Sequence, residues 1–165
     1  MMQPNNENLK DLISDQKVHQ TLIDNNVNLV SGLATNYLNH YIEILLLIEM
    51  LPDMRECFED IRTWKPMSYC EYAACSQLPN SELVLKVYDS VDAEQRRNLD
   101  AIAHEADTAL MSFINRAGTA LDLNDTNLLK EIALEAKEYL TPTIERMTGV
   151  ITPNAKTTTP FVCNF

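Results

Sequence analysis

The sequence predicts an all-α protein, a helical bundle of three to four long helices with short helices inserted between the second and the third. Apolar residues recur at steps of three and four along most of the chain, as they do on the buried face of a helix. Only three glycines occur among the 165 residues, too few for a hairpin-rich β protein. No stretch alternates between apolar and polar residues as a strand between turns does. A bundle is the simplest arrangement that buries such helix faces.

The first two helices are expected over residues 7–24 and 28–51. In the second, apolar residues keep a helical spacing from Val30 onward, and Pro52 ends the helix. Between residues 44 and 48 this helix is apolar on nearly every side. A helix of that kind lies in the centre of its bundle or faces a second subunit.

Short helices are expected next, each opened by a capping side chain. Asp53 and Ser68 each stand three residues before a glutamate, which is the spacing of a capping box. Pro66 separates these two helices, and Ser81 is expected to cap a third one.

Two long helices complete the predicted bundle. Asp92 opens the first, whose apolar stripe over residues 99–121 is the most regular in the sequence. Residues 124–125 turn the chain into the second, whose stripe keeps its phase across Pro142, so we expect a kink there rather than an end. Gly149 fits the position just after a helix C-terminus.

Residues 1–151 are therefore predicted to form one domain, followed by a Pro/Thr-rich tail over residues 152–165. The tail ends in apolar side chains, among them Phe161, Val162 and Phe165. Two phenylalanines would not stay in water without cost. We expect these residues to interact with protein, either by folding back on their own domain or by docking on a neighbour.

Charge and composition exclude several function classes. The net charge of -11 has the wrong sign for binding nucleic acid or an anionic membrane surface, and it would attract a basic protein partner. The alternative is a charge that only keeps a helical bundle soluble. The most apolar run, residues 42–51, contains Glu43 and Glu49 and is shorter than the roughly 20 residues of a membrane span. The start of the chain has no signal-peptide pattern, and the four cysteines form no C-x-x-C pair. We therefore expect a cytoplasmic protein with free thiols.

The motifs of common active sites are absent from the sequence. It contains no glycine-rich phosphate loop, no H-E-x-x-H metal motif, no G-x-S-x-G nucleophile motif and no Glu-x-x-His pair of a di-iron bundle. We therefore expect no cofactor, no metal and no catalytic activity. The leading hypothesis is a non-catalytic acidic helical module that binds another protein, or a second copy of itself along residues 42–51.

Two groups of residues are candidates for binding a small ligand or a metal. His40 lies in phase with its apolar stripe, next to Tyr41 and three residues before Glu43. The alternative for His40 is a core histidine with an ordinary hydrogen bond. The second group is an aromatic cluster, for which the alternative is a hydrophobic plug at one end of the bundle. The aromatic cluster consists of Trp64, Tyr69 and Tyr72.

A different hypothesis rests on residues 103–110, Ala-His-Glu-Ala-Asp-Thr-Ala-Leu. This segment resembles the phosphoacceptor box of sensor histidine kinases. The resemblance implies His104 as the phosphoacceptor on a long exposed helix, Glu105 as the neighbouring acid and Thr108 as the residue that orients the phosphatase water. Asp107 and Ala109 replace the usual Arg and Pro, and no ATP-binding lobe follows. The implied activity is phosphotransfer without kinase activity; the alternative is a polar helix face that carries one histidine.

Overall fold

The computed structural model describes residues 9–76 and 79–154 and confirms the all-α class. Within these residues no strand forms, and Val27 and Ala34 make an isolated bridge. The helices, including two short 3-10 helices, are α1 (Leu9–Ile13), α2 (Gln16–Asp24), a 3-10 helix (Thr35–Leu38), α3 (Asn39–Met50), a second 3-10 helix (Arg55–Cys57), α4 (Phe58–Ile61), α5 (Tyr69–Cys75), α6 (Ser81–Asp89), α7 (Ala93–Asp122) and α8 (Thr126–Ile151).

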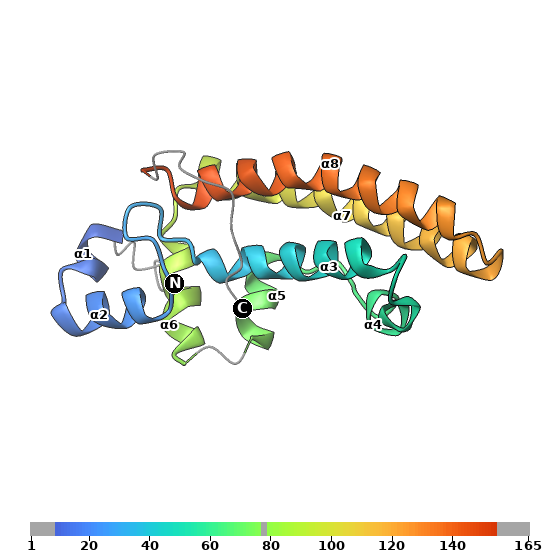
Figure 1. The fold of residues 1–165 in the computed structure, drawn as a ribbon. Helices are drawn as coiled ribbons and strands as arrows, with labels where there is room; N and C mark the ends of the chain where they lie inside the picture. The colour runs from blue at the N-terminus through green and yellow to red at the C-terminus, as the bar shows by residue number, and fades with distance from the viewer. Residues whose placement is uncertain (1–8, 77–78, 155–165) are drawn as a thin grey trace, which may run out of the picture.

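The two longest helices, α7 and α8, form an antiparallel pair, and α3 runs alongside them (Figure 1). The buried faces of this pair carry many alanines, which let two helix backbones approach closely. Ala106, Ala117 and Ala120 on α7 and Ala136 on α8 are fully buried. The predicted stripes of both helices are confirmed as core.

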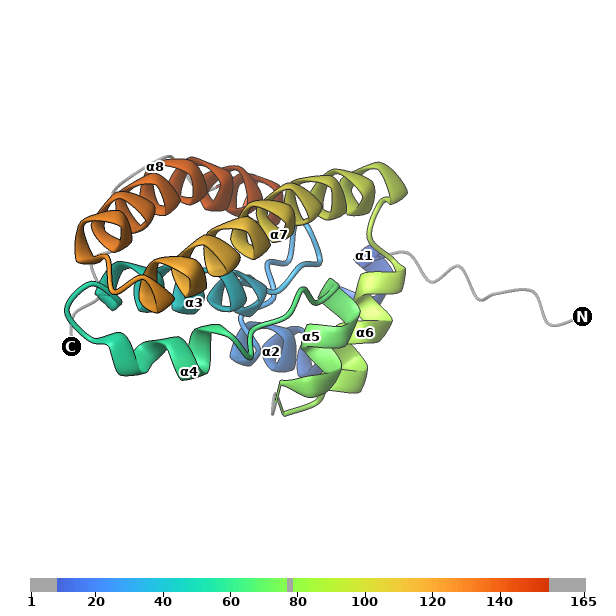
Figure 2. The same ribbon diagram turned by 90° about the vertical axis from the view of Figure 1, so that its right-hand side faces the viewer.

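The short helices cover the side of α3 that faces away from the α7–α8 pair. Figure 2 shows α4, α2, α5 and α6 on that side, with α7 and α8 on the other. The inner positions of α3, Tyr41, Ile44 and Ile48, are buried between the two layers. Of the short helices, α4, α5 and α6 lie between α3 and α7 in the chain, where the sequence predicts short helices.

The end of α8 is attached at two points. Ser31 donates a hydrogen bond from its hydroxyl to the Ile151 carbonyl at 2.5 Å. The Gln95 side chain, in the first turn of α7, donates to the Val150 carbonyl at 3.0 Å. These bonds satisfy carbonyl groups that a helix C-terminus leaves without an intrahelical partner.

Both helices expected at the start of the chain differ from the prediction. In place of one helix over residues 7–24 there are two, because Asp15 caps α2 by accepting from the amides of Lys17 and Val18 at 2.8 and 3.3 Å. Position 7, where we expected the first helix to begin, lies outside the described residues.

The helix expected over residues 28–51 begins instead at Thr35 as a 3-10 turn and becomes α-helical at Asn39. The cause is local. Asn28 accepts from the amides of Val30 and Ser31 at 2.9 and 3.1 Å, which forms a turn that competes with the helix. Gly32 then takes a φ of 73°, a left-handed conformation that suits glycine.

Two of the predicted capping residues are confirmed. The Ser68 hydroxyl accepts from the Glu71 amide at 3.2 Å, and the Glu71 carboxylate accepts from the Ser68 amide at 2.7 Å, which completes the capping box of α5. Asp92 caps α7 by accepting from the amides of Glu94 and Gln95.

Two other capping predictions are wrong. Asp53 lies in a turn, and the next helical segment begins after Met54 without a side-chain cap. At α6 the N-cap is Asn80 rather than Ser81, and it has a φ of 63°. Asparagine tolerates this left-handed conformation better than most residues.

Pro142 lies inside α8, and the helix continues through it as expected. Both Pro142 and Glu138 are exposed, so the carbonyl that the proline leaves without a partner faces water. The prediction for Gly149 is wrong, because α8 extends to Ile151 and Gly149 lies within its last turns.

This position of Gly149 gives a stability prediction. A Cβ atom added at Gly149 meets no heavy atom within 4 Å, so Gly149→Ala should raise the free energy of unfolding by about 0.5–1 kcal/mol. Urea unfolding followed by circular dichroism measures the change. Gly118→Ala is the matched control, because its Cβ would lie 3.0 Å from Phe58 Cζ and the ring would have to move. If Gly118→Ala raised the free energy of unfolding as much as Gly149→Ala does, this explanation would be contradicted.

Candidate functional site

The two predicted ligand groups lie together in one aromatic cluster. Tyr37 is at its centre and makes edge contacts with Tyr41, Tyr69 and Tyr72 at ring-centroid distances of 5.5, 5.4 and 5.7 Å. Tyr41 and Tyr69 are buried, and the Tyr69 hydroxyl accepts from the Ala34 amide at 2.7 Å. The cluster therefore ties α3 to α5 and to the loop before α3.

His40 packs at the edge of this cluster against Trp64. The two rings stack with their centroids 4.9 Å apart, and the indole N–H of Trp64 donates to the His40 carbonyl at 3.1 Å. The Nε2 atom of His40 is buried and has no hydrogen-bond partner among the described residues. Burial lowers the pKa of His40, while the Lys65 backbone acts in the opposite direction. These features favour a neutral imidazole packed as a core side chain.

Glu43 does not join His40 in the way a metal-binding or catalytic pair would. Its side chain is exposed, and it acts on Tyr72, whose pKa is raised first by burial and then by the Glu43 charge. No group of three or more His, Cys, Asp or Glu side chains within residues 9–76 and 79–154 is arranged to hold a metal ion.

Surface hollows lie elsewhere. One of about 600 Å³ lies between the first turns of α7 and the last turns of α8, with Asn98 and Arg146 among its lining residues. Another of about 410 Å³ lies at residues 80–83, at the start of α6. Neither hollow is lined by the aromatic cluster.

A chain of hydrogen bonds crosses the cluster and ends on α7. The Tyr37 hydroxyl donates to the Met67 carbonyl at 2.8 Å, the hydroxyls of Tyr37 and Tyr41 are 3.0 Å apart, and the Tyr41 hydroxyl lies 3.1 Å from Asp107 Oδ1. These are three contacts, but the two phenols supply only two hydrogens. If Asp107 is ionised, one of the three contacts lacks a hydrogen and cannot be a hydrogen bond. If Asp107 is protonated, its carboxyl group supplies the third hydrogen and all three contacts can be hydrogen bonds.

The electrostatics of Asp107 agree with this proton count. Burial raises the pKa of Asp107, and the hydrogen bond from Tyr41 and the His104 charge act in the opposite direction. Burial also raises the pKa of both Tyr37 and Tyr41, so both phenols keep their hydrogens at neutral pH. Asp107 is half-buried and faces Tyr41 of α3.

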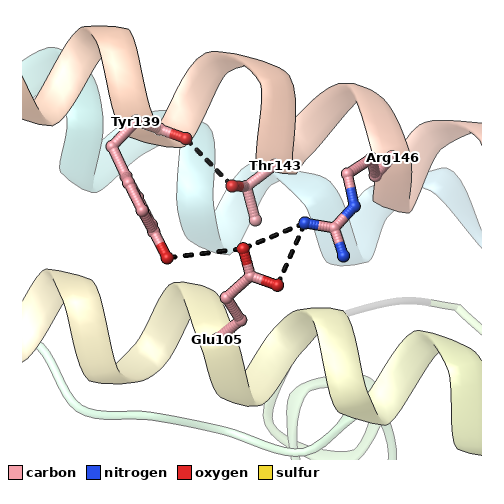
Figure 3. Close-up of polar contacts among 4 residues, drawn as sticks. All are labelled: Glu105, Tyr139, Thr143 and Arg146. Atoms are coloured by element: carbon pink, nitrogen blue, oxygen red, sulfur yellow. Dashed lines mark hydrogen bonds and ion pairs between the residues drawn. The ribbon is translucent and has the colours of Figure 1, made fainter.

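The residues of the phosphoacceptor hypothesis lie on α7. His104 is exposed, as expected. Glu105 accepts two hydrogen bonds from Arg146 at 2.9 and 3.0 Å and one from the Tyr139 hydroxyl at 3.3 Å (Figure 3). The Thr108 hydroxyl donates to the His104 carbonyl at 2.9 Å. Glu105 thus joins α7 to α8, and Thr108 is bonded to its own helix.

The outer side of α3 carries an exposed apolar surface that the search for motifs did not identify. Ile42, Leu46 and Met50 recur at steps of four on this helix, and Leu134 of α8 lies on the other side of an ion pair. That pair joins Lys137 to Glu49 at 2.9 Å; Glu49 is one turn from Leu46, and Lys137 is one turn from Leu134. We call Ile42, Leu46, Met50 and Leu134 the α3–α8 patch.

The patch side chains differ in their exposure. Leu46, Met50 and Leu134 are 39%, 42% and 58% exposed, and Ile42 is partly buried. The signal for this surface was present in the sequence, because residues 44–48 are apolar on nearly every side and one side remains outside the core.

The predicted interaction residues Phe161, Val162 and Phe165 lie outside the described residues. Cys57, Cys70 and Cys75 are free thiols. No helix in the described part of the chain is both long and apolar enough to cross a membrane. No protein-family model, curated protein or solved structure matches the sequence or the fold.

The proton count at Asp107 predicts a pH-dependent effect of Asp107→Asn. An asparagine amide supplies the third hydrogen at every pH, whereas the carboxyl loses it as the pH rises. Because the pKa of Asp107 is raised in the folded state, its contribution to stability is present at low pH and is lost as the pH rises through that pKa. The variant should match the wild type near pH 4 and exceed it by about 1 kcal/mol at pH 7.

Urea unfolding at both pH values measures this difference. Asp60→Asn is the control for removing one negative charge, because Asp60 is an exposed aspartate on α4. If the free energy of unfolding rises equally in the two variants at pH 7, the effect comes from net charge and the proton count is wrong.

Proposed function

We propose that this chain is a non-catalytic helical module that binds another protein through the α3–α8 patch. The observation that carries the proposal is the pair of exposed apolar side chains Leu46 and Met50 on α3, with the partly buried Ile42 one turn before them and the exposed Leu134 of α8 across the Lys137–Glu49 ion pair. Contiguous exposed apolar side chains beside polar groups are typical of protein-binding surfaces.

The energetics support docking at this patch. Fully burying a Leu or Met side chain contributes about 1.5–3 kcal/mol, and side chains that are already half-covered contribute about half of that. Covering Leu46, Met50 and Leu134 would therefore supply about 3 kcal/mol. This is enough to bias where a partner docks, and polar contacts around the patch would add specificity.

The charge of the chain favours a basic partner. A net charge of -11 attracts cationic surfaces over several ångströms, and added salt weakens the attraction. The chemistry that fits is a segment with apolar side chains at helical spacing and lysine or arginine at its flanks.

Paired serine variants test the proposed function. Met50→Ser should lower capture of the partner several-fold in a cross-linking pull-down from the source cells, and Met111→Ser should leave it unchanged. The two methionines are matched in exposure, at 42% and 40%, but Met111 lies on α7, away from the patch. Circular dichroism checks that both variants are folded.

A captured protein supports the proposal only if its recovery falls in Met50→Ser, persists in Met111→Ser and decreases with added salt. Recovery that is equal in both variants would refute the patch as the contact surface. Recovery that is independent of salt would refute a basic partner.

Phosphotransfer on His104 is a second candidate because the imidazole is exposed on a long helix. It predicts an acid-labile, alkali-stable phosphate after incubation with acetyl phosphate or with a phosphorylated response regulator. His104→Ala should abolish this phosphate, and His19→Ala should not. Intact-protein mass spectrometry at alkaline pH measures it, and the absence of any added phosphate in the wild type would exclude the hypothesis for these donors.

A further inference from the structure

We propose that the C-terminal segment Phe161–Phe165 of the same chain docks on the α3–α8 patch. The inference rests on the proposed function, because it assigns an occupant to the same surface. The segment lies outside the described residues, so its chemistry and its reach carry the argument.

The spacing of apolar side chains matches between patch and segment. From Ile42 to Met50 the patch extends about 12 Å along α3 at about 1.5 Å per residue. In an extended segment, Phe161, Cys163 and Phe165 point to the same side and span about 13 Å. One phenylalanine can therefore lie between Ile42 and Leu46 while the other lies between Met50 and Leu134.

The chain can reach the patch. The end of α8 is fixed beside the loop before α3, where Ser31 bonds to Ile151. Lys137 lies beside Glu49, and Leu134 marks the far end of the patch on α8, so the distance from Ile151 to that end is about 26 Å along the helix. An extended chain from Asn154 reaches about 23 Å by Phe161 and about 36 Å by Phe165. Both phenylalanines can thus reach the patch without any movement of α8.

A tethered segment fits this surface better than a second copy of the chain. A stable dimer interface buries about 800 Å² on each copy, and the four partly covered side chains of the patch supply only part of that area, so charged surface around the patch would have to complete it. Two copies that each carry a net charge of -11 also repel one another. A tethered segment has an effective concentration in the millimolar range, so a smaller contact is sufficient.

Disulfide trapping in the full chain tests the proposal. Leu46→Cys is introduced together with Cys70→Ser and Cys75→Ser. The native thiols that remain are Cys163 and Cys57, and Cys57 is buried. Mild oxidation should link position 46 to Cys163 within one chain, which intact mass and peptide mapping detect. Leu46 is exposed, so this substitution leaves the core unchanged.

Ala101→Cys in the same background is the matched control. Ala101 is an exposed residue on α7, the helix whose first turn bonds to Val150 near the end of α8, so chance contact with the tail is at least as frequent there. We expect the intrachain link at position 46 to form about tenfold faster than the link at position 101. Adding Phe161→Ser and Phe165→Ser should lower the rate at position 46 to that of the control.

Equal rates at positions 46 and 101 would overturn the proposal. A link that joins two chains, and that disappears on dilution, would show that the segment docks on a second copy and would overturn the assignment to the same chain. The experiment uses the isolated protein, so its result does not depend on whether a partner is captured through the patch.

Discussion

The close packing of α7 against α8 is the constraint on which the rest of the structure depends. Fully buried alanines on both helices let the two backbones approach, and α3 packs mainly against α8 of this pair. The short helices lie on the other side of α3, and the part of α3 that carries Leu46 and Met50 remains exposed. The exposed apolar patch is therefore a consequence of the helix order, because α3 is apolar on more sides than the bundle can cover.

The helices could be predicted wherever an apolar stripe continued for several turns. The stripes of α7 and α8 are regular and long, and tertiary packing follows them. The start of α3 could not be predicted from its stripe, because the Asn28 side chain bonds to nearby amides and Gly32 adopts a left-handed conformation. Val30 and Leu33 fit a helical spacing, yet they lie in a loop and Val30 is exposed.

The candidate site was predictable in part. The sequence identified His40 and Trp64 separately, and the structure stacks them. Tyr37 at the centre of the cluster could have been found from its step of four to Tyr41 on one helix face. The contact between Tyr41 and Asp107 could not, because the two residues are 66 positions apart and only the fold brings their helices together.

The two attachments at the end of α8 have a mechanical consequence. Any pull on the residues that follow Asn154 is transmitted first to the last turn of α8, where Ser31 and Gln95 hold the carbonyls of Ile151 and Val150. Such a load meets these bonds before it reaches the alanine-lined contact with α7, and it acts along the helix axis. A load on this end would therefore strain the last turn of α8 before it strains the packed part of the bundle.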